Sequence, residues 1–145
     1  MKFNAINDLD SKELYARAKA EAELIYNKPS TANGRSLKQI IETVLYGQAA
    51  ELYLIKQHGF KDDPREYKDV IDLNDNPVEV KVTEGEYYVK YVLSRCNDAA
   101  KDSWRKYPKI LYIFIGDKKT YDYHLHGVYH WNGESFCLQV QENSV

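Results

Sequence analysis

The sequence predicts an α/β (α+β) fold in which a central mixed β-sheet is flanked by helices. Helix-forming segments occupy the first 60 residues, strand-forming segments follow, and one more helical segment separates the first pair of strands from the second. With 145 residues, the chain is long enough to bury a core without disulfide or metal crosslinks. We therefore expect a single domain, 1–145.

Composition narrows the class of protein. Hydrophobic residues make up 43% of the chain and charged residues 29%, which excludes a disordered chain. The formal net charge of −2 means that binding of nucleic acid would require basic side chains gathered on one surface, or metal ions that offset acidic groups. The two cysteines lack a CxxC spacing, and no apolar window approaches the ~18 residues of a membrane span. We expect a soluble, cytoplasmic protein with no membrane partner.

The first 60 residues predict two helices. Residues 11–26 are rich in strong helix formers, with Asp10 or Ser11 as the N-cap. After a loop at 27–36, which contains Pro, Gly, Asn and Ser, a longer helix follows and ends at Gly59. Because the first helix is too polar to form a core alone, residues 1–30 are predicted to form a helical arm that could supply a homodimer interface.

Strands dominate the rest of the chain. Residues 69–73 and 77–82 predict two short strands joined by Asn-Asp-Asn. Residues 94–107 predict a helix. Residues 109–117 are apolar on both faces, which predicts a central strand, and residues 120–140 predict one or two more strands.

The segment PVEVKV carries the first candidate site residues. Its two-residue period places three valines on one face of the strand, and Glu79 and Lys81 on the other. Carboxylate oxygens are ligands that Mg²⁺ prefers, and an ammonium two residues away can contact a phosphate oxygen or an attacking water. The pattern is typical of a site that holds a metal and a phosphate.

The preceding strand supplies a second acid, whose identity depends on the register of the hairpin. If the connecting loop holds an odd number of residues, Asp69 shares the face of Glu79 and Lys81. If it holds two residues, Asp72 takes that place. Amphipathicity slightly favours Asp72, because the apolar residues of its strand would then join the valines. The hairpin residues alone leave both alternatives open.

A third acid lies on the longer helix. At 100° per residue the apolar residues of this helix form one stripe, and Glu51 falls inside it. A glutamate that faces the core is costly unless it is paired or bound to a metal. Two interpretations follow: a buried salt bridge, for example with Lys81, or a metal site.

Together these residues resemble the PD-(D/E)XK nuclease superfamily. The similarity rests on GQAAELYLIKQHGF followed by DVID and VEVK, and it covers residues 40–82. The spacing of Asp69, Glu79 and Lys81 is similar to that of small type II restriction endonucleases, and the end of the helix is similar to Holliday-junction-resolvase-like members. The resemblance implies a restriction-endonuclease-like fold. The chain departs from the pattern at Lys68, where the proline of the superfamily's name would stand.

The resemblance also implies residue roles and an activity. Asp69, Glu79 and Glu51 would bind Mg²⁺, for which Mn²⁺ would substitute, and Lys81 would position or activate the attacking water. Asp69 is preferred to Asp72 because the aspartate of the family usually precedes two apolar residues. The implied protein is a Mg²⁺-dependent endonuclease that hydrolyses phosphodiester bonds in DNA, most simply as a homodimer that cuts both strands. The alternatives are a junction resolvase of the same fold and a non-catalytic nucleic-acid-binding module on a degenerate nuclease fold.

Aromatic, basic and histidine side chains outside the motif are further candidates. Tyrosines interleave with basic residues in 87–95, a pattern that suits contact with DNA, although tyrosine is also common in half-buried strands. The basic residues of the 94–107 segment could bind phosphates or form a solvated helix face. Three histidines fall within 124–130, and we interpret them as side chains of an exposed strand and not as a zinc site.

Overall fold

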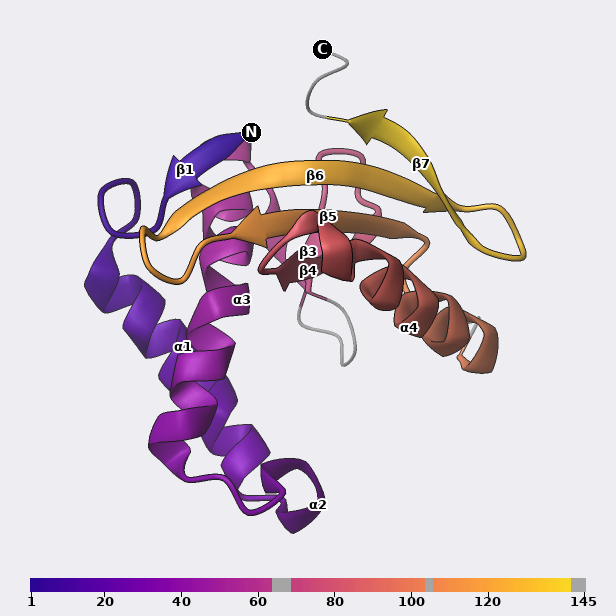
Figure 1. Ribbon diagram of the computed structural model, residues 1–145. Helices are drawn as coiled ribbons and strands as arrows, with labels where there is room; N and C mark the ends of the chain where they lie inside the picture. The colour runs from indigo at the N-terminus through magenta and orange to yellow at the C-terminus, as the bar shows by residue number, and fades with distance from the viewer. Residues whose placement is uncertain (64–68, 104–105, 142–145) are drawn as a thin grey trace.

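The computed structural model describes residues 1–63, 69–103 and 106–141. Its helices are α1 (Ser11–Tyr26), α2 (Pro29–Ala32), α3 (Leu37–His58) and α4 (Val89–Asp102), and a 3₁₀ turn, η1 (Glu86–Tyr88), precedes α4. Its strands are β1 (Lys2–Asn4), β2 (Lys61–Asp62), β3 (Val70–Ile71), β4 (Pro77–Thr83), β5 (Ile110–Gly116), β6 (Asp122–Trp131) and β7 (Phe136–Gln141). The chain is a mixed α/β protein, as the sequence predicts (Figure 1).

One curled seven-stranded sheet lies at the centre of the molecule (Figure 1). Its strand order is β1-β6-β5-β4-β3-β2, and β7 also pairs with β6. β4 and β5 are parallel because α4 connects them as a crossover, whereas the other pairs of described strands are antiparallel. The predicted central mixed sheet flanked by helices is therefore confirmed.

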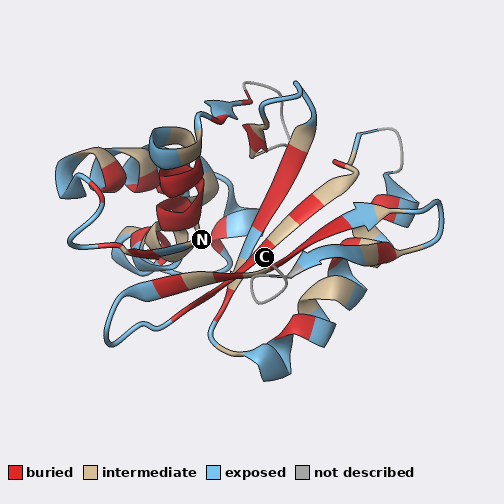
Figure 2. Ribbon diagram, turned by 90° about the horizontal axis from the view of Figure 1, so that it is seen from above, coloured by how far each residue is buried: buried red, intermediate tan, exposed pale blue. Residues whose placement is uncertain are grey.

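Helices cover both faces of the sheet (Figures 1 and 2). α3 packs on one face and buries the largest hydrophobic cluster, which includes Phe3, Leu54 and Phe114. α4 packs on the other face, where Cys96 and Leu111 are buried. The helices that cover the two faces thus come from different halves of the chain.

α1, α2 and the first half of α3 extend away from the sheet as a helical arm (Figure 1). A small hydrophobic cluster holds the arm together: Ala18, Ala22, Ala32, Ile40 and Ile41. These residues include two of the three buried positions of α1. The apolar stripe of α1 is therefore covered by α3 of the same chain, and β1 joins residues 1–30 to the sheet through β6.

The ends of the long helices follow from local chemistry. The carboxylate of Asp10 accepts the first free N–H groups of α1, and Ser36 and Gln39 form a reciprocal capping box at α3. α3 ends at Gly59, whose φ of 74° is in the left-handed region that glycine adopts without strain. Within the described residues, no helix is long and apolar enough to cross a membrane.

Several predicted boundaries are wrong. The helix predicted at 94–107 forms instead at Val89–Asp102, because its buried residues recur at helical spacing from Val89 onward although the Tyr-Tyr-Val start is typical of a strand. The loop predicted at 27–36 contains the short helix α2. β1 and β2 were not predicted, since segments of two or three residues carry no periodic signal.

Candidate active site

The β3–β4 hairpin decides which aspartate shares a face with Glu79. Val70 pairs with Val78 and Ile71 with Pro77, so the connecting loop is 72–76, with an odd number of residues. This register continues to Asp69 opposite Glu79, on the same face of the sheet. Asp72 has another role, because its carboxylate accepts the backbone N–H groups of the turn residues Asn74 and Asn76, each at 2.9 Å.

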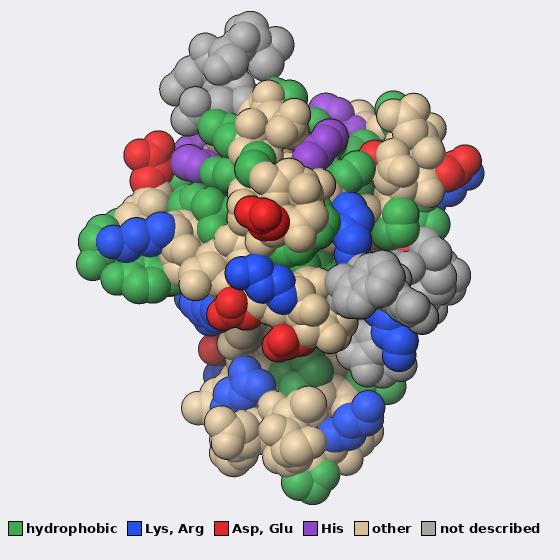
Figure 3. All heavy atoms as spheres, turned by 90° about the vertical axis from the view of Figure 1, so that its right-hand side faces the viewer, with side chains coloured by type: hydrophobic (Ala, Val, Ile, Leu, Met, Phe, Trp, Pro, Cys, Tyr) green, Lys and Arg blue, Asp and Glu red, His purple; other side chains and the backbone are tan. Residues whose placement is uncertain are grey.

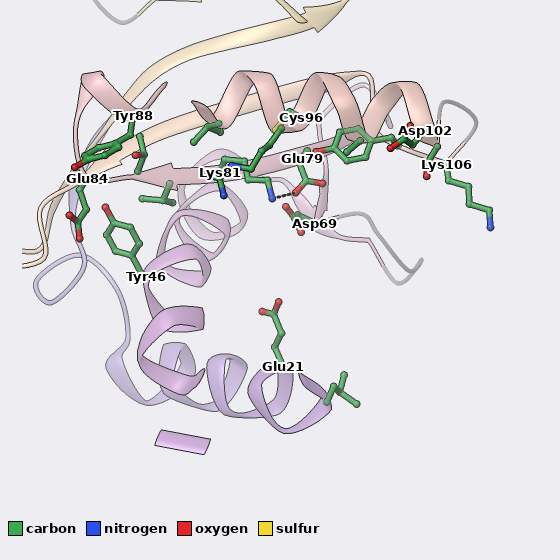
Figure 4. Close-up of a pocket in the computed structure, with 18 of the residues that line it drawn as sticks. Glu21, Tyr46, Asp69, Glu79, Lys81, Glu84, Tyr88, Cys96, Asp102 and Lys106 are labelled. Atoms are coloured by element: carbon green, nitrogen blue, oxygen red, sulfur yellow. Dashed lines mark ion pairs between the residues drawn. The ribbon is translucent and has the colours of Figure 1, made fainter. Parts of the chain in front are cut away.

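Asp69, Glu79 and Lys81 lie together at an unpaired edge of β4. Because β3 is only two residues long, the N–H of Val80 has no strand partner, and Oδ2 of Asp69 accepts it at 2.8 Å. The carboxyl groups of Asp69 and Glu79 are hydrogen-bonded to each other. Lys81 Nζ is 3.4 Å from Glu79 Oε1. The three side chains predicted from the hairpin therefore form one cluster (Figure 4).

Glu51 reaches the same region from α3. It is 9% exposed, so its predicted burial in the apolar stripe is confirmed. Its carboxyl group lies close enough to Asp69 and Glu79 for their negative charges to raise its pKa. Among the described side chains, Lys81 forms its ion pair with Glu79 and not with Glu51. The predicted alternative of a Glu51–Lys81 salt bridge is therefore not what this structure contains.

Burial and mutual repulsion change the protonation of this cluster. Burial, followed by the charges of Asp69 and Glu21, raises the pKa of Glu51 to about 9. Burial and the charge of Asp69 raise the pKa of Glu79 to about 8. Burial is the largest single effect on Lys81 and opposes its charge, but the combined attraction of Glu79, Cys96 and Asp69 outweighs it, so the pKa of Lys81 is raised. The acids therefore hold protons near neutral pH, whereas Lys81 remains charged.

Burial also raises the pKa of Asp69, although the Val80 N–H and the hydrogen bond from Glu79 favour its charged form. Burial and the mutual repulsion of the two carboxyl groups therefore favour a proton shared between them. A cation bound at these oxygens would take the place of that shared proton.

A cavity of about 1250 Å³ opens over the cluster. Asp69, Glu79 and Lys81 lie between the arm, which contributes Glu21, and the helix α4, which contributes Arg95 (Figure 4). This volume exceeds the roughly 300–1,000 Å³ of most small-molecule pockets. The cavity is therefore large enough for part of a polymer.

Glu21 is a cavity residue that the sequence did not single out. Its Oε2 accepts a 2.6 Å hydrogen bond from Gln48 Nε2, and Gln48 Oε1 in turn accepts one from Arg17. Arg17 is held by two 2.8 Å bonds to Asp62. A glutamate on a polar helix gives no signal by itself; the signal was Gln48, a buried amide on α3 that needs polar partners.

The donor set fits a hard divalent cation such as Mg²⁺. Within the described residues, no group of three or more His, Cys, Asp or Glu side chains is arranged to hold a metal by itself. Mg²⁺ is commonly bound through one or two carboxylates, with waters and substrate phosphate in the other positions. Asp69 and Glu79 would supply those two carboxylates, and Glu51 would add negative charge behind them once a bound cation had lowered its pKa.

The other candidate groups are distributed as follows. Arg95 and Lys106 line the cavity, whereas Arg105 and Lys68 lie outside the described residues. His126 Nε2 is 3.0 Å from the hydroxyl of Tyr129, an ordinary pairing for a strand histidine. Acidic and basic side chains alternate over the face shown in Figure 3, with no area of one sign.

Comparison with known proteins leaves the family open. No protein-family model, no curated protein and no solved structure matches this chain. The resemblance to the PD-(D/E)XK superfamily therefore rests on the residues of this chain, and it stays a prediction.

Proposed function

We propose that the protein is a Mg²⁺-dependent DNA endonuclease with a restriction-endonuclease-like fold. One observation carries the proposal: Asp69 and Glu79 face each other across neighbouring strands, with Lys81 beside them, in a cavity larger than most small-molecule pockets. Two carboxylates that can hold a metal ion, with an ammonium beside them, can promote hydrolysis of a phosphodiester.

Each side chain of the site has a distinct task in this proposal. Asp69 and Glu79 would hold the cation, which when bound would lower the pKa of water and shield charge on the phosphate. Lys81, fixed by Glu79 at 3.4 Å, donates to a nonbridging oxygen or orients the attacking water. Glu51 would add its charge from α3 once the bound cation had lowered its pKa. Burial of Glu51 and Glu79 would strengthen their interactions, whereas the side chain of Lys81 is 45% exposed and lines the cavity.

A homodimer is part of the proposal. One chain has one site of this kind, and two copies are the simplest means to cut both strands of a duplex. Since the buried stripe of α1 is already covered by α3, an interface in residues 1–30 would use exposed side chains such as Tyr15 and Tyr26. Sedimentation at micromolar concentration should show a dimer; a monomer throughout would contradict this part of the proposal alone.

Cleavage assays test the activity. The purified protein should cut plasmid and linear duplex DNA in Mg²⁺ or Mn²⁺ and not in EDTA. Glu79→Gln keeps the size of the side chain but removes a charged ligand, and we expect cleavage to fall at least about 10³-fold. Lys81→Met should fall by a similar factor. Glu42→Gln, an exposed glutamate of α3, is the matched control and should retain full activity.

The choice of substrate separates the proposal from its alternatives. Duplex, single-stranded and four-way DNA are compared under the same conditions. Cleavage confined to the four-way substrate would identify a junction resolvase. Metal-independent binding without cleavage of any substrate would indicate a non-catalytic module and would contradict the proposed activity.

A further inference from the structure

Three tyrosines form an exposed aromatic patch where α4 begins. Tyr87, Tyr88 and Tyr91 have 66%, 50% and 45% of their surface exposed. The ring of Tyr87 lies edge to face against Tyr88, with centroids 5.4 Å apart, and 5.9 Å from the ring of Tyr91. Aromatic rings in mutual contact and open to solvent indicate an interaction surface more strongly than single exposed rings do. We call these residues, with Lys90, the tyrosine patch.

Lys90 adds a positive charge to the rings. Its ammonium lies 5.0 Å from the ring centroid of Tyr87 and 5.2 Å from that of Tyr91. Within the part of the chain that the structure describes, Lys90 forms no ion pair. A cation can bind the phosphate of a nucleotide, and an aromatic ring beside it can stack on the base of the same nucleotide.

The acids near the patch do not pair with Lys90. Glu84 is paired with Lys118 at 2.9 Å. Glu86, on the 3₁₀ turn, forms no ion pair with Lys90 among the described residues. The ammonium of Lys90 is therefore open to an anion from outside.

The patch continues the cavity of the proposed active site. Tyr88 lines that cavity together with Lys81 and Glu84 (Figure 4). At this end of the cavity Lys118 connects two other lining residues. Its ammonium pairs with Glu84 and lies 4.9 Å from the ring centroid of Tyr46. A DNA strand that extended from Lys81 toward this end would pass beside Tyr88, whose ring is in contact with that of Tyr87.

We propose that the tyrosine patch binds an unpaired DNA strand next to the cleavage site, with bases stacked on the tyrosine rings and a phosphate on Lys90. The inference rests on the proposed function for the identity of the nucleic acid. It extends the proposed function by naming the substrate class: DNA with a single-stranded tail or gap. Every unpaired base offers a free face to an aromatic ring, whereas the bases of a duplex already stack on one another.

Binding in the absence of metal tests this inference. Fluorescence anisotropy in EDTA compares a labelled oligothymidine with a duplex of equal length. The double variant Tyr87→Ala/Tyr91→Ala should bind the single strand about tenfold or more weakly, and the duplex less than about threefold more weakly. The variant Tyr87→Phe/Tyr91→Phe keeps the rings and should bind as wild type does. Tyr121→Ala, which removes a ring of 45% exposure in the turn before β6, is the control.

The outcomes distinguish this inference from the proposed activity. Selective loss of single-strand binding supports the patch even if Mg²⁺ produces no cleavage, which would contradict only the nuclease. Unchanged binding, or equal losses for both DNAs, would overturn the inference. The inference would also be overturned if wild type were a dimer and the double alanine variant a monomer, because the patch would then join two copies of the chain.

Discussion

At the scale of single residues, the molecule concentrates buried charge in one place. Glu51 and Glu79 are both less than a tenth exposed, and Asp69 lies between a backbone N–H and another carboxyl group. Buried acids without a full set of cationic partners raise the free energy of the folded state. Such an arrangement is typical of a functional site, where stability is lower than packing alone would allow.

The raised pKa values predict how metal-free stability depends on pH. Unfolded glutamates lose their protons near pH 4.5, whereas folded Glu79 and Glu51 keep theirs up to about 8 and about 9. Between these values the folded state binds more protons than the unfolded state, so the free energy of unfolding falls as pH rises. Urea unfolding in EDTA from pH 5 to pH 8 measures this decline.

Glu51→Gln supplies the matched comparison. The neutral amide cannot titrate, so this variant should show a shallower decline and exceed wild type at pH 8 by roughly 2 kcal/mol. Glu42→Gln should retain the wild-type slope, because Glu42 is exposed. If the free energies of unfolding of Glu51→Gln and wild type declined in parallel, Glu51 would be charged in the folded state, which would contradict its raised pKa.

At the scale of elements, the β3–β4 hairpin separates two aspartates into a site residue and a turn residue. Asp69→Asn can still accept the Val80 N–H, so we expect normal stability and a loss of cleavage of about 10²-fold or more. Asp72→Ala removes the acceptor of two turn N–H groups, which should cost about 1 kcal/mol of unfolding free energy, with cleavage almost unchanged. Unfolding curves and cleavage rates of the two variants check this division, and the opposite pattern would place Asp72 in the site.

Predictability from sequence follows the length and periodicity of each element. α1, α3 and β5 carry strong periodic or apolar signals and were predicted close to their observed bounds. The predicted start of α4 is wrong because tyrosines and valines favour strands locally, whereas packing against β5 overrides that preference. The choice between Asp69 and Asp72 required the loop length, which depends on tertiary pairing. Glu21 was missed because its contacts with Gln48 lie 27 positions away in the sequence.

At the scale of the whole molecule, the arm and α4 enclose the acidic cluster from opposite sides (Figure 4). Binding of a cation there should stabilise the entire fold, because the ion offsets buried negative charge that the unfolded chain leaves in water. We expect Mg²⁺ at ten times its dissociation constant to raise the melting temperature by about 3 °C or more at neutral pH.

Differential scanning fluorimetry with Mg²⁺, and with NaCl at equal ionic strength, measures this effect. Glu79→Gln should lose the Mg²⁺ response, and Glu42→Gln should keep it. A response to Mg²⁺ that is the same in all three proteins would locate the ion elsewhere on the surface.

The hydrogen bond from Val80 to Asp69 bears on the denticity of the proposed metal site. One oxygen of Asp69 already completes the backbone pattern of the sheet, which favours coordination of an ion through the other oxygen alone. An ion held through a single oxygen of Asp69 would have more of its other positions filled by exchangeable oxygens of solvent and substrate. The short length of one strand would in this way set how much of the ion is available for catalysis.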